Sequence, residues 1–445
     1  MTCPARAALA ACALFLAACD AGAQSTVAKE SAGAKKMIQL TNIHGLTKSP
    51  INAPRHPLRP GSPVATPSAT PVAGPGYTRP FANESQNSRL PATLGTNEWK
   101  PLWNLPLDPA MPARFVLAIG ARAIVHGRQW HLVDAATGRS ISNDRLGGGP
   151  IVIDQALKGF ITHYTSAHLS VRRLADGKEL FKYLPGQGDV YTRAFLTRHG
   201  GRLLILGWER ALDPHGRKKA ENSRVEIIDL GMPPKADSFG FLSSSSQVGE
   251  LYIKELGVQM ATAGPTIVAA ARNEFYRMTW DLQVTEILEG NFDPQGLSLD
   301  EAGNTYMAVA AGGTNHVWKI SPKGEIAYDF TLPGPGIVLE TPPIVGYDHT
   351  VYQLAGPQIY AVGENGKLRW SRTAEGAVGG AAISGDGQLL VSEGACVVAY
   401  DAKGDRRKVH CFPNETLTSP PILNESGHLL VTSKTALHCL QGVGK

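Results

Sequence analysis

The sequence predicts an all-β protein in which one sheet motif is repeated along the chain. Three stretches near the C-terminus, residues 341–366, 379–404 and 419–444, align with one another without a gap. Each contains short apolar segments and ends in a glycine, which suits the positive φ of a tight hairpin turn. A repeat of roughly 40 residues made of short strands is typical of a β-propeller, in which each repeat folds into one blade.

The turn markers from Asp134 onward predict eight four-stranded blades. The region 232–290 is irregular, so seven blades is the alternative. The eighth repeat reaches Lys445 where its outer strand should begin, and residues 100–105 resemble the outer strand of an earlier repeat, with Trp103 at a similar place. We therefore expect this N-terminal strand to complete the last blade and close the ring, which leaves no open junction between the first and last blades.

Residues 1–18 have the pattern of an export signal. Arg6 precedes an apolar run that is too short to span a bilayer, and residues 16–19 resemble a bacterial lipobox, Leu-Ala-Ala-Cys. The resemblance implies that the Cys19 thiol is lipidated and becomes the new N-terminus. An ordinary signal peptide with a chance cysteine is the alternative. Asp20 resembles an inner-membrane retention signal, but that rule varies between bacteria, so either membrane is open.

Residues 19–98 are expected to form a disordered tether, and residues 99–445 the propeller. Nine prolines lie between Pro50 and Pro80, among small and polar residues that cannot bury enough apolar surface to offset chain entropy. Strand patterns begin at Trp99 and continue to the end. The localisation that follows is a bacterial cell envelope, with the propeller in the periplasm or at the surface.

The three cysteines outside the signal and the lipobox are Cys396, Cys411 and Cys439. If residues 403–404 form a two-residue hairpin turn, Cys396 and Cys411 lie opposite each other at a hydrogen-bonded pair. A cross-strand disulfide is one interpretation, because exported proteins retain disulfides. Two buried thiols packed as small apolar groups is the other.

The charge and the motifs predict neither nucleic-acid binding nor a catalytic, cofactor or metal site. The net charge of +5 is mild and is not concentrated on one segment. HExxH, CxxC and GxSxG motifs do not occur in the sequence. His410 and His438 each precede a cysteine, but neighbours on a strand point to opposite faces and cannot chelate one ion together.

A charged insertion at residues 209–224 is the candidate contact surface for a partner. Loops on a rigid scaffold often carry binding residues. The alternative is a solvated hairpin tip. The basic residues of the insertion are Arg210, Arg217, Lys218 and Lys219.

The repeat pattern over residues 99–445 resembles the quinoprotein-like (PQQ-like) propeller repeat. That repeat occurs in pyrroloquinoline-quinone dehydrogenases and in non-catalytic lipoproteins that help to assemble outer-membrane proteins. The dehydrogenases have an adjacent cysteine pair beside the quinone, and no two cysteines here are neighbours. The resemblance therefore implies the non-catalytic branch, with an envelope protein as partner and the membrane contacted through the lipid.

A second resemblance covers residues 296–324, which are similar to the repeat of NHL and lactonase-type propellers. Those hydrolases hold calcium in the central channel with Glu, Asn and Asp oxygens. Asp300 and Asn304 flank a tight turn, so we expect them to form hydrogen bonds within that turn. The function expected from the sequence is a membrane-tethered binding or scaffolding module, with a calcium-dependent hydrolase and a quinone-dependent dehydrogenase as alternatives.

Overall fold

The computed structural model describes Thr47–Lys48 and, with gaps, residues 90–443. The gaps are residues 91, 96–97, 111–112, 114, 128, 145–150, 155–157, 165–167, 184–189, 192–195, 200–201, 213–217, 230–246, 254–257, 335–338 and 340. The chain divides into two compact units, Met1–Ile38 and Gln39–Lys445, and all described residues belong to the second. Cys19 lies outside the described residues.

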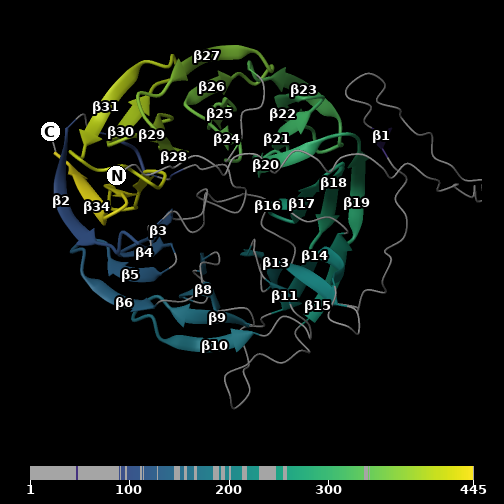
Figure 1. Ribbon diagram of the computed structural model, residues 1–445, viewed down its shortest axis with the longest axis horizontal. Helices are drawn as coiled ribbons and strands as arrows, with labels where there is room; N and C mark the ends of the chain where they lie inside the picture. Colours follow the sequence, from purple (N-terminus) through teal and green to yellow (C-terminus); the bar gives the residue numbers. More distant parts are fainter. Residues whose placement is uncertain are drawn as a thin grey trace, which may run out of the picture. The chain divides into compact units, whose positions relative to one another are not determined.

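The described strands form eight antiparallel sheets that follow one another around a ring (Figure 1). Within each sheet, the strands are arranged one after another from the centre of the ring to its periphery, so each sheet is one blade. The predicted eight-bladed propeller is confirmed. The seven-bladed alternative is wrong, because the irregular region contributes strands to two separate blades, the third and the fourth.

Blades 1 to 4 contain the strands of the first half of the ring. Blade 1 consists of β3 (Phe115–Ile119), β4 (Arg122–His126), β5 (Trp130–Asp134) and β6 (Ser140–Asp144). Blade 2 consists of β7 (Ile151–Asp154), β8 (Gly159–Tyr164), β9 (His168–Arg173) and β10 (Glu179–Tyr183). Blade 3 consists of β11 (Val190–Tyr191), β12 (Leu196–His199), β13 (Arg202–Leu212), β14 (Lys218–Asp229) and β15 (Gln247–Ile253). Blade 4 consists of β16 (Gln259–Ala263), β17 (Thr266–Ala271), β18 (Glu274–Thr279) and β19 (Val284–Glu289).

Blades 5 to 8 are the more regular half. Blade 5 consists of β20 (Asp293–Leu299), β21 (Thr305–Ala311), β22 (Thr314–Ile320) and β23 (Ile326–Thr331). Blade 6 consists of β24 (Ile344–Val345), β25 (Val351–Ala355), β26 (Gln358–Val362) and β27 (Leu368–Thr373). Blade 7 consists of β28 (Val378–Ile383), β29 (Leu389–Glu393), β30 (Cys396–Tyr400) and β31 (Arg406–Cys411). Blade 8 consists of β32 (Ile422–Leu423), β33 (His428–Thr432), β34 (Ala436–Gly442) and, from the other end of the propeller sequence, β2 (Trp99–Pro106).

The expected closure of the ring by an N-terminal strand is confirmed. β2 pairs antiparallel with β34, and Trp103 lies opposite Cys439. Pro101 and Pro106 lack an N–H group, which a strand at the outer edge of a sheet tolerates because that edge faces solvent. The same prolines make the outer edge of blade 8 a poor template for pairing with another chain.

The second and third strands of each blade form the core. Every residue of β25 and of β29 is buried, because a neighbouring blade covers each face of the sheet. The outer strand β27 buries Trp370 alone among its six residues. This difference explains why the inner strands show apolar runs in the sequence, whereas the outer strands show isolated aromatic residues.

Packing against the propeller begins before Trp99, where the sequence analysis placed the boundary. Leu90 and Leu94 are 0% and 2% exposed and belong to the same core cluster as blade 8. The Leu90 N–H donates to the Ile383 carbonyl at 2.7 Å, and the Gly385 N–H donates to the Ala92 carbonyl at 2.7 Å. We call residues 90–94 the strap. The sequence analysis assigned it to the tether because it directly follows a stretch rich in proline and polar residues.

One further pairing lies within the segment that was expected to be a tether. β1 (Thr47–Lys48) pairs antiparallel with β19, with Thr47 opposite Glu289. In the part of the chain that the structure describes, no helix has the length and apolarity required to cross a bilayer.

Candidate functional site

Each blade has two ends, which differ in the turns and connections that they carry. The turns between the first and second strands, and between the third and fourth, lie at one end. The turns between the second and third strands lie at the other end, together with the connections from each blade to the next. This follows from the antiparallel order of the four strands. We call the second end the connection face.

A hollow of about 1200 Å³ lies on the connection face of blades 6 to 8 and blade 1. Its apolar lining includes Phe115, Ile344, Leu354 and Leu417, and the rest is mostly glycine, alanine, proline and threonine. Its charged lining residues are Glu375, on the connection between blades 6 and 7, and Lys434, in the turn between β33 and β34. Among the described residues, no carboxylate forms an ion pair with Lys434.

Glycine in β28 allows the walls of the hollow to pack closely. A Cβ atom on Gly380 would lie 2.6 Å from Pro420 Cγ, and φ at Gly380 is +134°. A Cβ on Gly379 would lie 2.6 Å from the Leu417 carbonyl oxygen. Only glycine allows β28 to touch the connection between blades 7 and 8 at both places.

Gly394, in the turn between β29 and β30, bonds to the connections on both sides of blade 7. Its N–H donates to the Ala377 carbonyl at 2.7 Å, and its own carbonyl accepts from the Leu417 N–H at 2.8 Å. A Cβ on Gly376 would lie 2.9 Å from Gly394 Cα. The turn of blade 7 is therefore the backbone element that joins the two walls of the hollow.

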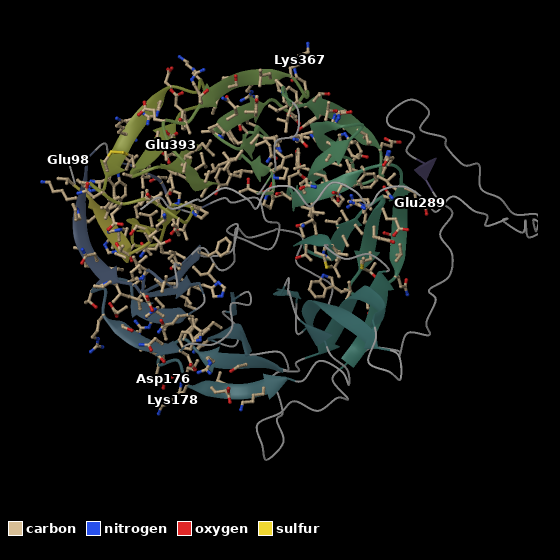
Figure 2. All side chains as sticks on the ribbon, viewed as in Figure 1. Glu98, Asp176, Lys178, Glu289, Lys367 and Glu393 are labelled. Carbon is tan, nitrogen blue, oxygen red and sulfur yellow. A yellow bond between two sulfur atoms is a disulfide. The ribbon has the colours of Figure 1, made fainter. Side chains whose placement is uncertain are left out.

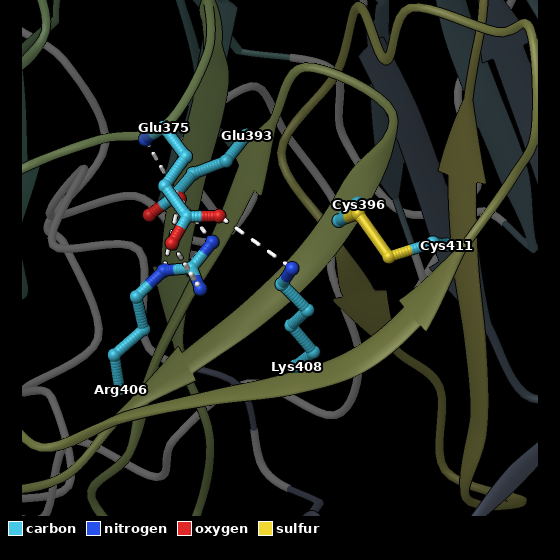
Figure 3. Close-up of a disulfide and its surroundings, with 6 residues drawn as sticks. All are labelled: Glu375, Glu393, Cys396, Arg406, Lys408 and Cys411. Carbon is cyan, nitrogen blue, oxygen red and sulfur yellow. Dashed lines mark hydrogen bonds and ion pairs between the residues drawn. A yellow bond between two sulfur atoms is a disulfide. The ribbon is translucent and has the colours of Figure 1, made fainter.

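A buried ion network lies beside this turn (Figure 3). The Glu393 side chain is 0% exposed and accepts from Arg406 Nη2 at 3.0 Å. Glu393 also accepts from the Glu375 backbone N–H at 3.3 Å and from the Tyr400 hydroxyl. The outer part of the network is exposed, where Glu375 pairs with Arg406 at 2.9 Å and with Lys408 at 3.6 Å. The network attaches the wall that carries Glu375 to blade 7.

The electrostatics of the network follow from burial and charge. Burial first, and then the Glu393 carboxylate, raise the pKa of the Tyr400 hydroxyl, which therefore stays protonated and donates. Burial acts to lower the pKa of Arg406, but its bond to Glu393 outweighs this and raises it. Arg406 is consequently a permanent cation between two carboxylates.

Cys396 and Cys411 are joined by a disulfide on the face of blade 7 that also carries Arg406, with Cα atoms 4.0 Å apart (Figure 3). They lie opposite each other, but at a non-hydrogen-bonded pair, because the Phe412 N–H donates to the Ala395 carbonyl at 2.9 Å. The expectation of a hydrogen-bonded pair is wrong. Its cause is a longer turn, in which the Asp401 N–H donates to the Asp405 carbonyl, followed by a one-residue bulge that restores the register.

His410 and His438, which precede Cys411 and Cys439 in the sequence, pack against an aromatic ring. The rings of His410 and His438 lie 4.8 Å and 4.3 Å from Phe412, between blades 7 and 8. Burial lowers the pKa of both histidines, so both are neutral at pH 7. Among the residues described, no three His, Cys, Asp or Glu side chains gather in a way that could hold a metal ion.

Asp300 and Asn304 form hydrogen bonds within the turn between β20 and β21, as expected. Asp300 Oδ1 accepts from the Asn304 N–H at 2.9 Å, and Asp300 Oδ2 accepts from Asn304 Nδ2 at 2.8 Å. The Tyr306 hydroxyl donates to the same carboxylate at 2.9 Å. This turn lies at the end of blade 5 away from the connection face.

The predicted contact loop forms the outer part of a long hairpin in blade 3. Arg210 belongs to β13 and lies opposite Glu221, and Lys218 and Lys219 belong to β14. Arg217 lies outside the described residues. The backbone alone therefore places three of the four basic residues on paired strands.

The sequence analysis did not identify the hollow or its ion network. One signal was present, because the aligned repeats carry Ala355, Glu393 and Ser433 at the same position. A carboxylate there follows an apolar strand and should be buried, and a buried carboxylate requires partners. The walls themselves come from segments that are remote in sequence and show no local pattern.

No family model and no curated protein matches this chain. Solved structures share its fold. BamB from Moraxella catarrhalis is 10% identical with a TM-score of 0.53, covering 77% of this chain and 97% of that one. A quinohemoprotein alcohol dehydrogenase from Comamonas testosteroni is 10% identical with a TM-score of 0.60, covering 84% and 81%. The computationally designed protein Ika8 is 12% identical with a TM-score of 0.51, covering 78% and 99%. At these identities the likeness shows the fold alone, which is a β-propeller.

Proposed function

We propose that this protein is a lipid-anchored binding or scaffolding module of the bacterial cell envelope, which recognises an envelope protein at the hollow without covalent chemistry. The lipobox-like residues 16–19 and the proline-rich stretch after them support the anchor and the tether. The PQQ-like propeller fold, which is that of BamB, is consistent with this role.

The observation that carries the proposal is the hollow. At about 1200 Å³ it exceeds the roughly 300–1,000 Å³ of a small-molecule site. Its walls are connections held on a rigid scaffold, which is where recognition surfaces of propeller-like scaffolds are expected. The described residues of the strap contact the turn between β28 and β29, at the opposite end of the blades, so these residues do not cover the hollow.

The test is site-specific photo-crosslinking in intact cells with the full chain. The crosslinking residue replaces Lys434, an exposed residue of the hollow, or Lys367, which is also exposed but lies at the opposite end of blade 6 (Figure 2). We expect a discrete adduct with an envelope protein from position 434 and none from position 367. Equal adducts from both positions, or none from either, would contradict the proposal.

The hydrolase alternative came from the resemblance to the NHL and lactonase-type repeat over residues 296–324, among them Asp300 and Asn304. Their oxygen and nitrogen atoms bond to one another and to Tyr306, away from the hollow. Saturable calcium binding by the purified protein together with lactone hydrolysis would favour the hydrolase. Dye reduction that depends on added quinone would favour the dehydrogenase.

A further inference from the structure

We propose that the hollow is under redox control: the Cys396–Cys411 disulfide clamps the turn that joins its two walls, and reduction by a dithiol loosens them. The inference rests on the proposed function only in taking the hollow as the partner site. The clamp itself is a property of blade 7 that can be measured without a partner.

The disulfide lies at the end of blade 7 where the hollow lies. Cys396 is the first residue of β30 and Cys411 is the last residue of β31. Only Ala395 separates Cys396 from Gly394, and the Ala395 carbonyl accepts from the N–H of Phe412, next to Cys411. The covalent bond and this hydrogen bond together fix the turn relative to the outer strand.

The turn then passes this restraint to both walls. Gly394 bonds to Ala377 on one wall and to Leu417 on the other, at 2.7 Å and 2.8 Å. Glu393, the residue before it, accepts from the backbone N–H of Glu375 in the first wall. Movement of the turn therefore breaks hydrogen bonds in two connections that the sequence separates by about 40 residues.

The bond is open to a reductant. Cys411 is exposed and Cys396 is half-buried, whereas Cys439, the third described cysteine, is buried and free. Lys408 lies on the same face of β31 as Cys411 but is paired with Glu375, so the exposure of Cys411, and not a neighbouring cation, gives a thiolate access to the bond. An exposed disulfide is the kind that thiol exchange reaches.

The chemistry balances with an external dithiol as the electron donor. Its thiolate attacks one sulfur, the S–S bond breaks, and a mixed disulfide forms. The second thiol of the reductant then releases the protein. The two cysteines have gained two electrons and two protons as thiols, and the reductant has become a disulfide.

Hydrogen exchange of the full chain, measured by mass spectrometry, tests the clamp. Three samples are compared: the oxidised protein, the protein reduced under native conditions with dithiothreitol, and the double variant Cys396→Ser/Cys411→Ser. We expect peptides covering residues 374–380 and 412–420 to exchange about ten-fold or more faster in the last two samples. Peptides from blade 5 should not change, and reoxidation should restore the first pattern.

Unchanged exchange in the two walls, or faster exchange confined to β30 and β31, would refute the clamp. An equal increase in all blades would also refute it, since that shows general destabilisation. The variant Thr137→Ala, in a blade 1 turn remote from the hollow, is the control: it gives the hydrogen-exchange pattern of a propeller that is less stable but keeps its disulfide. If the variant does not fold, reduction of the wild-type protein decides alone.

Crosslinking from position 434 separates the two proposals. Adducts that form equally in oxidised and reduced protein would support the proposed function and reject the clamp's control of binding. Faster exchange of the walls without any adduct would support the clamp and reject the hollow as a partner site. Adducts that diminish on reduction would support both.

Discussion

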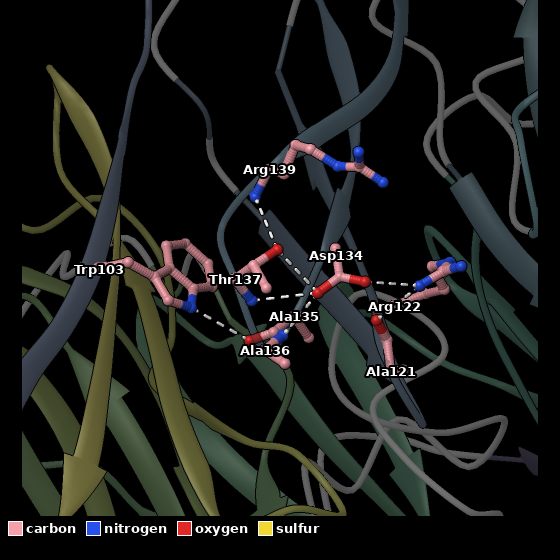
Figure 4. Close-up of polar contacts among 8 residues, drawn as sticks. All are labelled: Trp103, Ala121, Arg122, Asp134, Ala135, Ala136, Thr137 and Arg139. Atoms are coloured by element: carbon pink, nitrogen blue, oxygen red, sulfur yellow. Dashed lines mark hydrogen bonds and ion pairs between the residues drawn. The ribbon is translucent and has the colours of Figure 1, made fainter.

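The indole ring of Trp103, in the outer strand of blade 8, lies directly against Gly138 in a turn of blade 1. The indole nitrogen points to the Ala135 carbonyl of the same turn (Figure 4). A Cβ atom on Gly138 would lie 2.5 Å from Trp103 Cδ2, and Trp103 Nε1 donates to the Ala135 carbonyl at 3.2 Å. The same contact recurs between blades 6 and 7, where a Cβ on Gly404 would lie 2.7 Å from the Trp370 ring. Each ring is therefore a joint between successive blades, and the Trp103 joint closes the propeller.

This relationship predicts that Gly138→Ala destabilises the protein more than glycine-to-alanine substitution at an open turn. Gly427→Ala is the matched control, because φ is +75° at Gly427 and +73° at Gly138, but nothing lies within 4 Å of a Cβ at Gly427. Both variants carry the left-handed penalty of about 1–2 kcal/mol. Gly138→Ala adds the cost of displacing the indole, about 1–3 kcal/mol. Equal losses in urea unfolding would show that the indole moves aside freely.

The Asp134 side chain predicts a pH dependence of stability. Burial acts to raise the pKa of Asp134, but hydrogen bonds from Thr137 and Ala136 and the Arg122 guanidinium outweigh it and lower the pKa. The stability that this carboxylate contributes is therefore fully present above its unfolded pKa, about 3.9, and is lost as pH falls through the lower folded value.

The comparison is between the wild-type protein and Asp134→Asn, which can still accept from the turn but cannot pair with Arg122 as an anion. We expect the wild-type protein to be more stable at pH 7 by a few tenths to about 1 kcal/mol. This difference should shrink at about pH 2.5, below the unfolded pKa. A difference that stays constant over this range would mean that the charge of Asp134 contributes nothing.

Glu393 and Glu375 both contact Arg406, but only the first is buried. Glu393→Gln removes the charge of a side chain that is 0% exposed and leaves Arg406, 21% exposed, with one carboxylate. We expect a loss of about 3 kcal/mol in the free energy of unfolding. Glu375→Gln, at a side chain that is 60% exposed, should cost less than about 1 kcal/mol. Similar losses for the two variants would contradict the assignment of the buried end as the stabilising one.

The disulfide should stabilise the fold as well as the hollow. It closes a loop with a sequence separation of 15, for which the chain-entropy estimate is about 3 kcal/mol. Urea unfolding of Cys396→Ser/Cys411→Ser should show a loss of this order, and reduced wild-type protein should match the variant. If the reduced wild-type protein were as stable as the oxidised one, the bond would be neutral for folding.

The sequence predicted the features that repeat and missed those that occur once. Gly366 and Gly404 could be identified as turn residues because the same turn recurs at the same spacing, and Trp103 because a second strand of the same kind supplied the comparison. The lining of the hollow includes Glu375 and Lys434, which lie on different elements, so only the packing of successive blades against one another brings them together. That Cys396 lies opposite Cys411 was predicted. The longer turn and the one-residue bulge shift the register by one residue in opposite directions, so neither could be detected from the spacing of the two cysteines.

The strap shows the same limit and carries the last prediction. Leu90 lies among prolines and polar residues, but its side chain is 0% exposed and the Tyr347 hydroxyl donates to its carbonyl at 3.0 Å. Leu94, four residues further on, donates its N–H to Asp386 Oδ1 at 3.0 Å. If residues 90–94 are part of the fold, Leu90→Ala should cost about 2–5 kcal/mol, as for other buried leucines. Leu102→Ala, at a leucine that is 40% exposed in β2, should cost less than about 1 kcal/mol. A Leu90→Ala variant as stable as the wild-type protein would return the start of the propeller to Trp99, because a tether residue contributes nothing to the core.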